Sequence, residues 1–133
     1  MSVVVDCSTL VAALVATGPH GAWAEELVAA HALYAPELVL VEATNVLRRL
    51  ELSNRITTPE ASAAQADLMQ LQIELFPFEP FAERIWELRQ SVTSYDAWYV
   101  AIAEAFEFPL ATLDDRLAKS NGSKCEFLLA KPR

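Results

Sequence analysis

The chain contains little of what disulfide-bonded, secreted or membrane-spanning proteins are built from. Its 133 residues include only two cysteines and three glycines. Cys7 and Cys125 lie near opposite ends, each without a second cysteine nearby, which excludes a disulfide framework and a zinc-binding spacing. No apolar run approaches the roughly 18 residues of a membrane span. The N-terminus has no basic stretch and reaches Asp6 too early for a signal peptide. These absences predict a soluble protein of the cytoplasm.

Basic side chains are also scarce. The chain has 10 lysines and arginines against 18 aspartates and glutamates, which gives a net charge of −8. The excess of acids is explained either by solubility or by acids that gather to hold cations. It is unfavourable for binding nucleic acid, because lysine and arginine neutralise the phosphates. A nucleic-acid function would therefore require a bound metal or a basic partner chain. The length and the hydrophobic content of 53% predict one globular domain over residues 1–133.

Short apolar strands alternate with helices along the sequence. We predict strands at residues 3–6, 33–35, 73–78, 109–113 and 125–129. We predict helices from a cap at Ser8 or Thr9 to about residue 16, and over residues 22–30, 36–50, 59–72, 80–89 and 95–106, with a short helical turn at 114–119. The Gly-Pro-His-Gly stretch at residues 18–21 is interpreted as a break. Because tight hairpin signals are missing, this order predicts a three-layer α/β/α sandwich with a mostly parallel central sheet.

Two acids fall at the ends of predicted strands, and two more in early turns of predicted helices. Asp6 ends the first strand and Asp114 follows the fourth, whereas Glu42 and Asp96 each interrupt an apolar helical stretch. In parallel sheets, ligands bind outside the carboxyl ends of the strands. Unpaired carboxylates are rarely buried, so an acid on a core-like face is informative. We therefore expect these four acids to lie together at one edge of the sheet.

Each of these acids alone has a simpler explanation. Asp6 can cap the helix that follows it, and Glu42 can pair with Arg48 or Arg49 or simply be exposed. Asp96 can interact with the dipole of its helix, and Asp114 can belong to an ordinary turn. Only the joint arrangement at one edge of the sheet favours a shared function.

Carboxylates that gather in this way need a cation. Two carboxylates about 4 Å apart repel by roughly 4 kcal/mol at an effective dielectric constant of about 20. This repulsion raises their pKa values unless a positive charge relieves it. Mg²⁺ and Mn²⁺ prefer oxygen ligands, whereas His20 and His31 show no partner pattern that would indicate a catalytic role. A cation held by carboxylates can activate water and stabilise charge on a phosphodiester.

Four short segments are distinctive in their order and spacing. They are Asp6-Cys7-Ser8, Glu42-Ala43-Thr44-Asn45-Val46-Leu47, the segment from Tyr95 to Ala103, and the segment from Ala111 to Leu117. Together they resemble the successive signatures of the PIN-domain family, most closely those of VapC-type toxins from toxin–antitoxin pairs. The resemblance implies an α/β/α fold, an endoribonuclease dependent on Mg²⁺ or Mn²⁺, a homodimer, and inhibition by a cognate antitoxin. The residues that match the family's metal-binding and catalytic acids are Asp6, Glu42, Asp96 and Asp114.

The same resemblance suggests supporting residues. Ser8 lies two residues after the first acid and Thr112 two before the last, and both match hydroxyl positions of the family. Asp115 is adjacent to the last acid, but the threonine-x-aspartate pattern selects the aspartate before it. Asn45 lies three residues after Glu42 on the same helical face. It orients Glu42, contacts a phosphate, or has only a capping or core role.

Arginines and aromatic residues near these segments have two interpretations each. Arg48, Arg49 and Arg116 either hold RNA phosphates or lie on solvated helix faces. Trp98 and Tyr99 either stack on bases or belong to the core, and their position beside an acid on a core-like face favours the core.

Other functions fit part of the pattern. A phosphatase with a nucleophilic aspartate would carry a second aspartate where Ser8 stands, and a receiver-type signalling domain would need paired acids at the first strand. Neither pattern is present in the sequence. The remaining alternative is a catalytically weak PIN-like module that acts through protein partners. The complete set of four acids argues against this alternative, and an assay of RNA cleavage with and without Mn²⁺ distinguishes the two.

Overall fold

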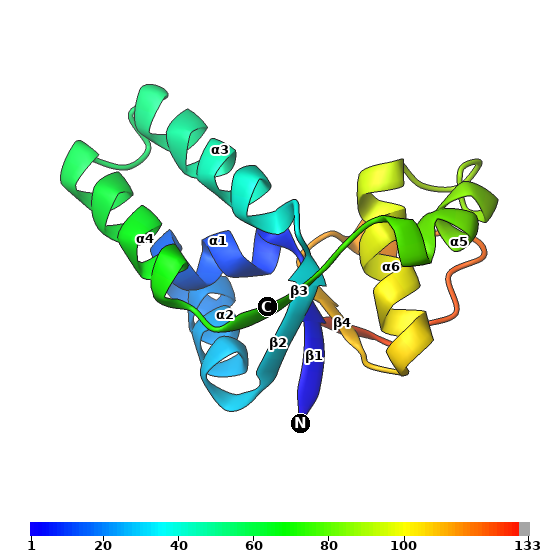
Figure 1. The fold of residues 1–133 in the computed structure, drawn as a ribbon. Helices are drawn as coiled ribbons and strands as arrows, with labels where there is room; N and C mark the ends of the chain where they lie inside the picture. The colour runs from blue at the N-terminus through cyan, green and yellow to red at the C-terminus, as the bar shows by residue number, and fades with distance from the viewer. Residues whose placement is uncertain (131–133) are drawn as a thin grey trace.

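The computed structural model describes residues 1–130 and has a five-stranded sheet at its centre (Figure 1). The strands are β1 (Ser2–Val5), β2 (Ala32–Pro36), β3 (Ile73–Phe76), β4 (Leu110–Thr112) and β5 (Phe127–Leu129). They lie in the order β3-β2-β1-β4-β5, and every neighbouring pair is parallel. The three valines of β1 are completely buried, because this central strand has neighbours on both sides and helices over both faces. The predicted α/β sandwich with a parallel sheet is confirmed.

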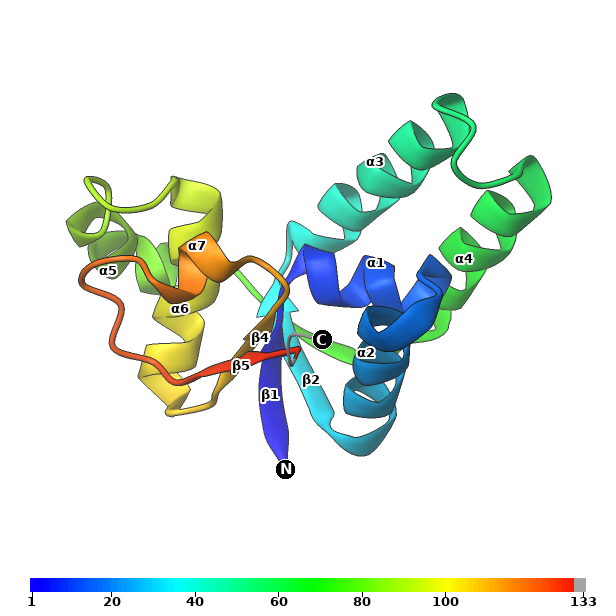
Figure 2. The same cartoon turned by 180° about the vertical axis from the view of Figure 1, so that it is seen from behind.

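Helices cover the two faces of the sheet as separate layers (Figures 1 and 2). One layer contains α1 (Cys7–Val15), α2 (Gly18–Ala30), α3 (Val39–Leu52) and α4 (Thr58–Gln70). The other contains the short 3₁₀ helix η1 (Glu79–Phe81), α5 (Ala82–Glu87), α6 (Ser94–Phe106) and α7 (Asp115–Ala118). α6 packs on β1, β2 and β4, whereas α3 and α4 run side by side and project beyond the sheet. No helix within residues 1–130 is both long and apolar enough to cross a membrane.

Two predicted boundaries are wrong for local reasons. The stretch interpreted as a break is the beginning of α2, which starts at Gly18 with Pro19 in its first turn, where the missing N–H is not needed. Gly21 is required there, because a Cβ at this position would lie 2.2 Å from the carbonyl oxygen of Ala16. Pro36, expected to begin a helix, is the last residue of β2, and α3 begins at Val39.

Three helices also begin earlier than predicted, each after a capping residue. Asp6 caps α1 in place of Ser8 or Thr9, since its carboxylate accepts a hydrogen bond from the Thr9 N–H, which confirms the capping role that was the simpler explanation for this acid. Thr57 caps α4 and forms a capping box with Glu60. Thr93 caps α6. The cap of α1 matters most, because it fixes the position of an acid that the sequence marks as functional.

The strand order places a crevice at one edge of the sheet. From β1 the chain adds β2 and β3 on one side, then returns to add β4 and β5 on the other side. Such a reversal leaves a crevice outside the carboxyl ends of the two strands that flank it, here β1 and β4. Val5 pairs with Ala111 in this register, so the residues that follow, Asp6 and Thr112, lie side by side.

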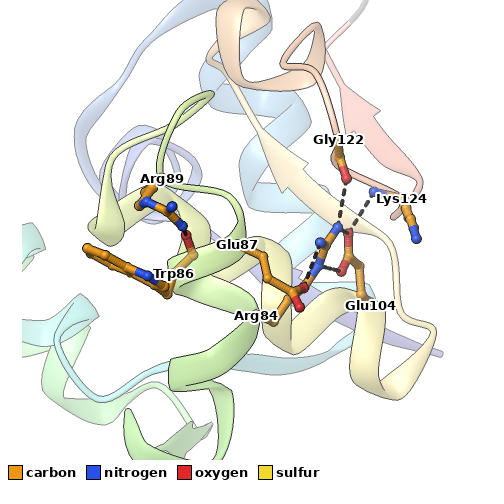
Figure 3. A network of polar contacts seen from close by, with 7 residues as sticks. All are labelled: Arg84, Trp86, Glu87, Arg89, Glu104, Gly122 and Lys124. Atoms are coloured by element: carbon orange, nitrogen blue, oxygen red, sulfur yellow. Dashed lines mark hydrogen bonds and ion pairs between the residues drawn. The ribbon is translucent and has the colours of Figure 1, made fainter.

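A network of ion pairs and hydrogen bonds joins the far end of α6 to the segment before β5 (Figure 3). Arg84 of α5 donates to both carboxylate oxygens of Glu104, at 2.7 and 3.1 Å, and to the carbonyl oxygen of Gly122 at 2.7 Å. The Lys124 N–H donates to the same carboxylate at 2.7 Å. Burial alone would raise the pKa of Glu104, but these donors outweigh it and lower that pKa. The network therefore holds α5, α6 and this segment together.

Candidate active site

A pocket of about 320 Å³ lies at the carboxyl ends of β1 and β4 and is lined by all four predicted acids. The residues that line it are Asp6, Cys7, Ser8, Val11, Glu42, Val46, Asp96, Tyr99 and Asp114. A larger hollow of about 760 Å³ lies beside β2 and β3, but Glu74 is the one acid among its lining residues. The candidate site is therefore distinguished from the larger hollow by its four acids, which come from distant segments, and not by its size.

Asp6 is the most completely held of the four acids. Its Oδ1 accepts hydrogen bonds from the Ser8 hydroxyl at 2.7 Å and from the Thr9 N–H at 3.0 Å. Its Oδ2 accepts from the Thr112 hydroxyl. Burial raises the pKa of Asp6, and these three donors oppose that rise without cancelling it. The carboxylate is thus fixed in orientation by neutral groups, with no arginine or lysine ion-paired to it among residues 1–130.

The two hydroxyl groups also position the segment that carries the last acid. The Ser8 oxygen accepts from the Leu113 N–H at 3.0 Å, and the Thr112 oxygen accepts from the Asp114 N–H at 2.9 Å. Each hydroxyl therefore donates to Asp6 and accepts from the backbone that follows β4. This arrangement gives Ser8 and Thr112 a common structural role, because together they tie the ends of β1 and β4 to each other.

The two adjacent aspartates after β4 lie in different surroundings. Asp114 lines the acidic pocket and caps α7, accepting from the Arg116 N–H at 2.9 Å. Asp115 lines a separate hollow of about 540 Å³ together with His20 and Lys119. The structure therefore groups Asp114, and not Asp115, with the other three acids.

Glu42 is held by a residue to which the sequence alone gave no such role. The Tyr99 hydroxyl donates to Glu42 Oε1 at 2.7 Å. Burial raises the pKa of Glu42, the Tyr99 hydrogen bond lowers it, and the charges of Asp96 and Asp6 raise it further, for a net rise. Glu42 forms no ion pair with an arginine in the described part of the chain, and it is half-buried, so both simpler explanations for this acid are wrong.

Asp96 lies in the first turn of α6, but Thr93 caps that helix. Burial raises the pKa of Asp96, and the charges of Asp114 and Asp6 raise it further, while Arg116 opposes them. A helix dipole would favour the charged form of an acid at this end. Burial and the neighbouring acids outweigh the Thr93 hydrogen bond and Arg116, which is typical of a crowded carboxylate site.

The pocket offers oxygen ligands but not a closed cage. Within residues 1–130, no three carboxylate, imidazole or thiol groups converge closely enough to enclose a metal ion by themselves. Mg²⁺ commonly keeps several of its waters and is held directly by only one or two carboxylates. A hydrated divalent cation therefore fits a pocket lined by four carboxylates, whereas a Zn²⁺ site built from histidine and cysteine does not.

The remaining predicted residues lie around the pocket rather than in it. Asn45 is exposed on α3, does not line the pocket, and makes no hydrogen bond to Glu42 in the described chain. Arg48 lines a hollow between α3 and α4 with Glu51, away from the acids. Arg116 is almost fully exposed, and its Nε lies 3.7 Å from Asp114 Oδ1.

The aromatic residues after Asp96 take different places. The Trp98 ring is partly buried and packs edge-on against Phe78, with ring centroids 5.4 Å apart. The Tyr99 ring is buried, with 2% of its surface exposed, so it presents no face for stacking on a base, as the core interpretation predicted. The spacing of three residues from Asp96 to Tyr99 was the available signal that both share one face of α6.

Comparison with known proteins gives a consistent assignment. Residues 3–122 match the family model of the PIN domain. Ribonuclease VapC1 of Mycobacterium tuberculosis is 39% identical over 129 residues, which cover 96% of this chain and 97% of that protein. The crystal structure of M. tuberculosis VapC20, a toxin that cleaves the sarcin–ricin loop, has a TM-score of 0.68 at 20% identity, covering 89% of this chain and 94% of that one. VapBC-5 of the same species, from the VapBC family of toxin–antitoxin systems, has a TM-score of 0.61 at 22% identity, covering 99% of this chain and 100% of that one.

Proposed function

The chain belongs to the PIN-domain family, among the VapC ribonucleases, and on that premise we propose that its four pocket acids hold the divalent cation with which it cuts RNA. The observation that carries this proposal is the convergence of Asp6, Glu42, Asp96 and Asp114 on one pocket. Burial raises the pKa of the first three, and the charges of neighbouring acids add to the rise for Glu42 and Asp96. A cation in the pocket would relieve this repulsion, and it would also offset the unfavourable net charge of −8 for binding RNA.

Mg²⁺ or Mn²⁺ suits this set of oxygen ligands. When bound, the cation activates a water molecule and stabilises negative charge on the phosphodiester. Asp6 contributes a carboxylate of fixed orientation, because Ser8 and Thr112 hold both of its oxygens. Asp96, on α6, and Asp114, at the start of α7, lie in the helical layer opposite to that of Glu42. They would hold the cation directly or through water molecules bound to it. Glu42 contributes its Oε2, because Oε1 accepts the hydrogen bond from Tyr99.

Two exposed arginines flank the acids and are the candidates for holding RNA phosphates. Arg49 lies seven residues after Glu42, two turns along the same face of α3. Burial raises the pKa of the pocket residue Cys7 to about 12, with Arg49 opposing the rise. Arg116 acts in the same way on Asp96 from α7. We propose that the RNA backbone crosses the pocket between Arg49 and Arg116, and that Arg48, which faces α4, takes no part.

The protein partner follows from the family and from the charge of the pocket. As a VapC-type toxin, the chain acts in a toxin–antitoxin pair, and we propose a cognate antitoxin that brings at least one arginine or lysine into the acidic pocket. Such a side chain would replace the cation and block RNA together. Replacing each basic residue of the inhibitory segment should accelerate dissociation for a pocket contact, and change only the salt dependence of association for a rim contact. Unchanged inhibition by every variant would contradict this mode of inhibition.

We also propose that the active form is a homodimer in the cytoplasm, which agrees with the two cysteines being free thiols. The oligomeric state is measurable by light scattering during size-exclusion chromatography.

An assay of RNA cleavage tests the proposed function against the alternative of a catalytically weak binding module. The purified chain is incubated with transfer, ribosomal and messenger RNA, in EDTA and in millimolar Mn²⁺. We expect defined cleavage products with Mn²⁺ and none in EDTA, and a higher melting temperature in Mn²⁺, because the ion binds the folded pocket. Equal cleavage in both conditions would contradict the metal-dependent mechanism, and antitoxin binding without any cleavage would favour the binding module.

A further inference from the structure

Tyr99 connects the two helical layers across the candidate active site. Its hydroxyl, on α6, donates to Glu42 Oε1, on α3, at 2.7 Å. These helices cover opposite faces of the sheet (Figure 1). Within residues 1–130, no other hydrogen bond between side chains joins α3 to α6. The separation of the acids carried by these two helices is therefore set at this contact as well as by the sheet.

The tyrosine is placed to act on the acid rather than on a substrate. Only 2% of its surface is exposed, so its ring is part of the core and is not accessible to a base. Tyr99 also lines the acidic pocket, one turn along α6 from Asp96. The position of its hydroxyl is fixed by the packing of the ring, and the hydroxyl in turn fixes one oxygen of Glu42.

We propose that Tyr99 is a positioning residue that orients Glu42 for the divalent cation, an inference that rests on the proposed role of Glu42 in metal binding. With Oε1 occupied by the tyrosine, Oε2 is the oxygen available to the ion. Partners in the outer shell of metal sites orient the ligands in this way, and losing such a partner commonly weakens metal binding 10- to 100-fold.

The chemistry of the donor explains why a tyrosine serves here. A lysine or arginine at this position would neutralise Glu42 and compete with the cation for its charge. Arg84 does this to Glu104, whose pKa is lowered by the ion pair. A phenol hydroxyl donates a hydrogen bond but carries no positive charge, so Glu42 is held in place while its negative charge remains available to the metal.

The test is the affinity of the metal-free chain for Mn²⁺, measured from the electron paramagnetic resonance signal of the free ion. Tyr99→Phe removes only the hydroxyl and keeps the buried ring. We expect its affinity for Mn²⁺ to be about 10- to 100-fold weaker than that of wild type. Tyr95→Phe is the matched control, because Tyr95 lies one turn earlier on the same helix, is 60% exposed, and does not line the pocket. Its affinity should equal that of wild type.

A double variant shows whether Tyr99 acts through Glu42. In the Glu42→Gln background the carboxylate charge is already lost, so adding Tyr99→Phe should weaken Mn²⁺ binding by less than a further twofold. A general structural role of Tyr99 would instead weaken binding equally in both backgrounds, and that result would overturn the proposal. Wild-type affinity in a folded Tyr99→Phe variant would overturn it as well.

Two further measurements separate the possible failures. If Tyr99→Phe does not fold, Glu42→Asp keeps the charge but is too short to reach the tyrosine, and should weaken Mn²⁺ binding at least tenfold. Wild-type affinity of Glu42→Asp would overturn the proposal. If Asp96→Asn binds Mn²⁺ as well as wild type, the proposed metal site itself is wrong. If Asp96→Asn loses binding while Tyr99→Phe retains it, only the role of Tyr99 is wrong.

Discussion

The acids at the two ends of α6 have pKa values that are shifted in opposite directions. At the N-terminal end, Asp96 lies among like charges, and burial together with Asp114 and Asp6 raises its pKa. At the C-terminal end, Glu104 accepts two hydrogen bonds from Arg84 and one from the Lys124 N–H, which outweigh burial and lower its pKa. The dipole of the helix would favour the reverse, since it stabilises an anion at the N-terminus and not at the C-terminus.

Under the proposed function, this contrast distinguishes an acid that stabilises the fold from one that binds the cation. Glu104 is compensated by the protein itself, so its charge contributes to the stability of the fold (Figure 3). Asp96, Asp6 and Glu42 form no ion pair with lysine or arginine in the described residues, and we propose that their charge serves a bound cation. The raised pKa of Asp96 predicts that its charge destabilises the metal-free fold, as is typical of residues in binding sites.

The largest expected difference between the two ends is in catalysis. Asp96→Asn should lower RNA cleavage in Mn²⁺ by more than about 100-fold, because even the loss of an outer-shell partner commonly costs 10- to 100-fold. Glu104→Gln should leave the cleavage rate within about twofold of wild type. Initial rates measured at saturating Mn²⁺ with both purified variants check this prediction. Equal activity of Asp96→Asn and wild type would remove Asp96 from the site.

Stability should show the converse difference. Glu104→Gln should lower the free energy of unfolding by about 1–3 kcal/mol, because it weakens charged hydrogen bonds of a largely buried carboxylate. Asp96→Asn should leave the metal-free stability unchanged or raised, since it removes like-charge repulsion. Urea unfolding at pH 7 measures both changes. If Asp96→Asn destabilised the fold as much as Glu104→Gln, the claim that only the charge of Glu104 stabilises the fold would be wrong.

As the pH is lowered, the free energies of unfolding of both variants should approach that of wild type, Glu104→Gln from below and Asp96→Asn from above. The charge of Glu104 stabilises the fold above its ordinary pKa of 4.5, and this contribution is lost as the pH falls through the lowered folded-state pKa. The charge of Asp96 destabilises the fold above its raised folded-state pKa, and this effect disappears as the pH falls towards its ordinary value of 3.8.

The deficit of Glu104→Gln and any gain of Asp96→Asn should therefore both shrink between neutral pH and about pH 3. Unfolding curves in urea across this range, with wild type at each pH, provide the measurement. Differences that stay constant with pH would show that the two charges are not the cause.

The smallest expected effect concerns the arginines beside the acids. Arg49→Ala should reduce the slope of log affinity for single-stranded RNA against log salt by about 0.7, which corresponds to one lost phosphate contact. Arg48→Ala is the matched control, because Arg48 faces α4 on the same helix. Binding is measured in Mn²⁺ with a non-cleavable RNA analogue, so that the cation is present and the RNA is not cut. Equal slopes for both variants would show that α3 does not present one specific face to RNA.

The sequence predicts the acidic pocket because strand ends in a parallel sheet share one edge. Asp6 and Asp114 follow strands that lie side by side, and this much follows from the alternation of strands and helices. The choice of Asp114 over Asp115 came from the family pattern, and the structure groups the same residue with the other acids.

Contacts between distant segments could not be predicted in the same way. The tyrosine that holds Glu42 lies on an apolar helix face, where its ring is explained by the core, and its hydroxyl has no sequence signal of its own. The bond of Arg84 to Glu104 joins residues on two helices whose packing angle the sequence does not specify. The local errors at Gly18 and Pro36 have another cause, since both residues are compatible with either side of a boundary.

The most direct test of the proposal that the pocket acids bind a cation, and that Glu104 does not, is to locate Mn²⁺ in crystals by its anomalous scattering. Crystals of the wild-type chain grown in millimolar Mn²⁺ should show an anomalous difference peak in the pocket lined by Asp6, Glu42, Asp96 and Asp114, and none beside Glu104. Crystals of Asp96→Asn should lose that peak or show it much weakened. A pocket without a peak in the wild-type crystals, or a peak that survives unchanged in Asp96→Asn, would contradict the claim that these four acids hold the catalytic cation.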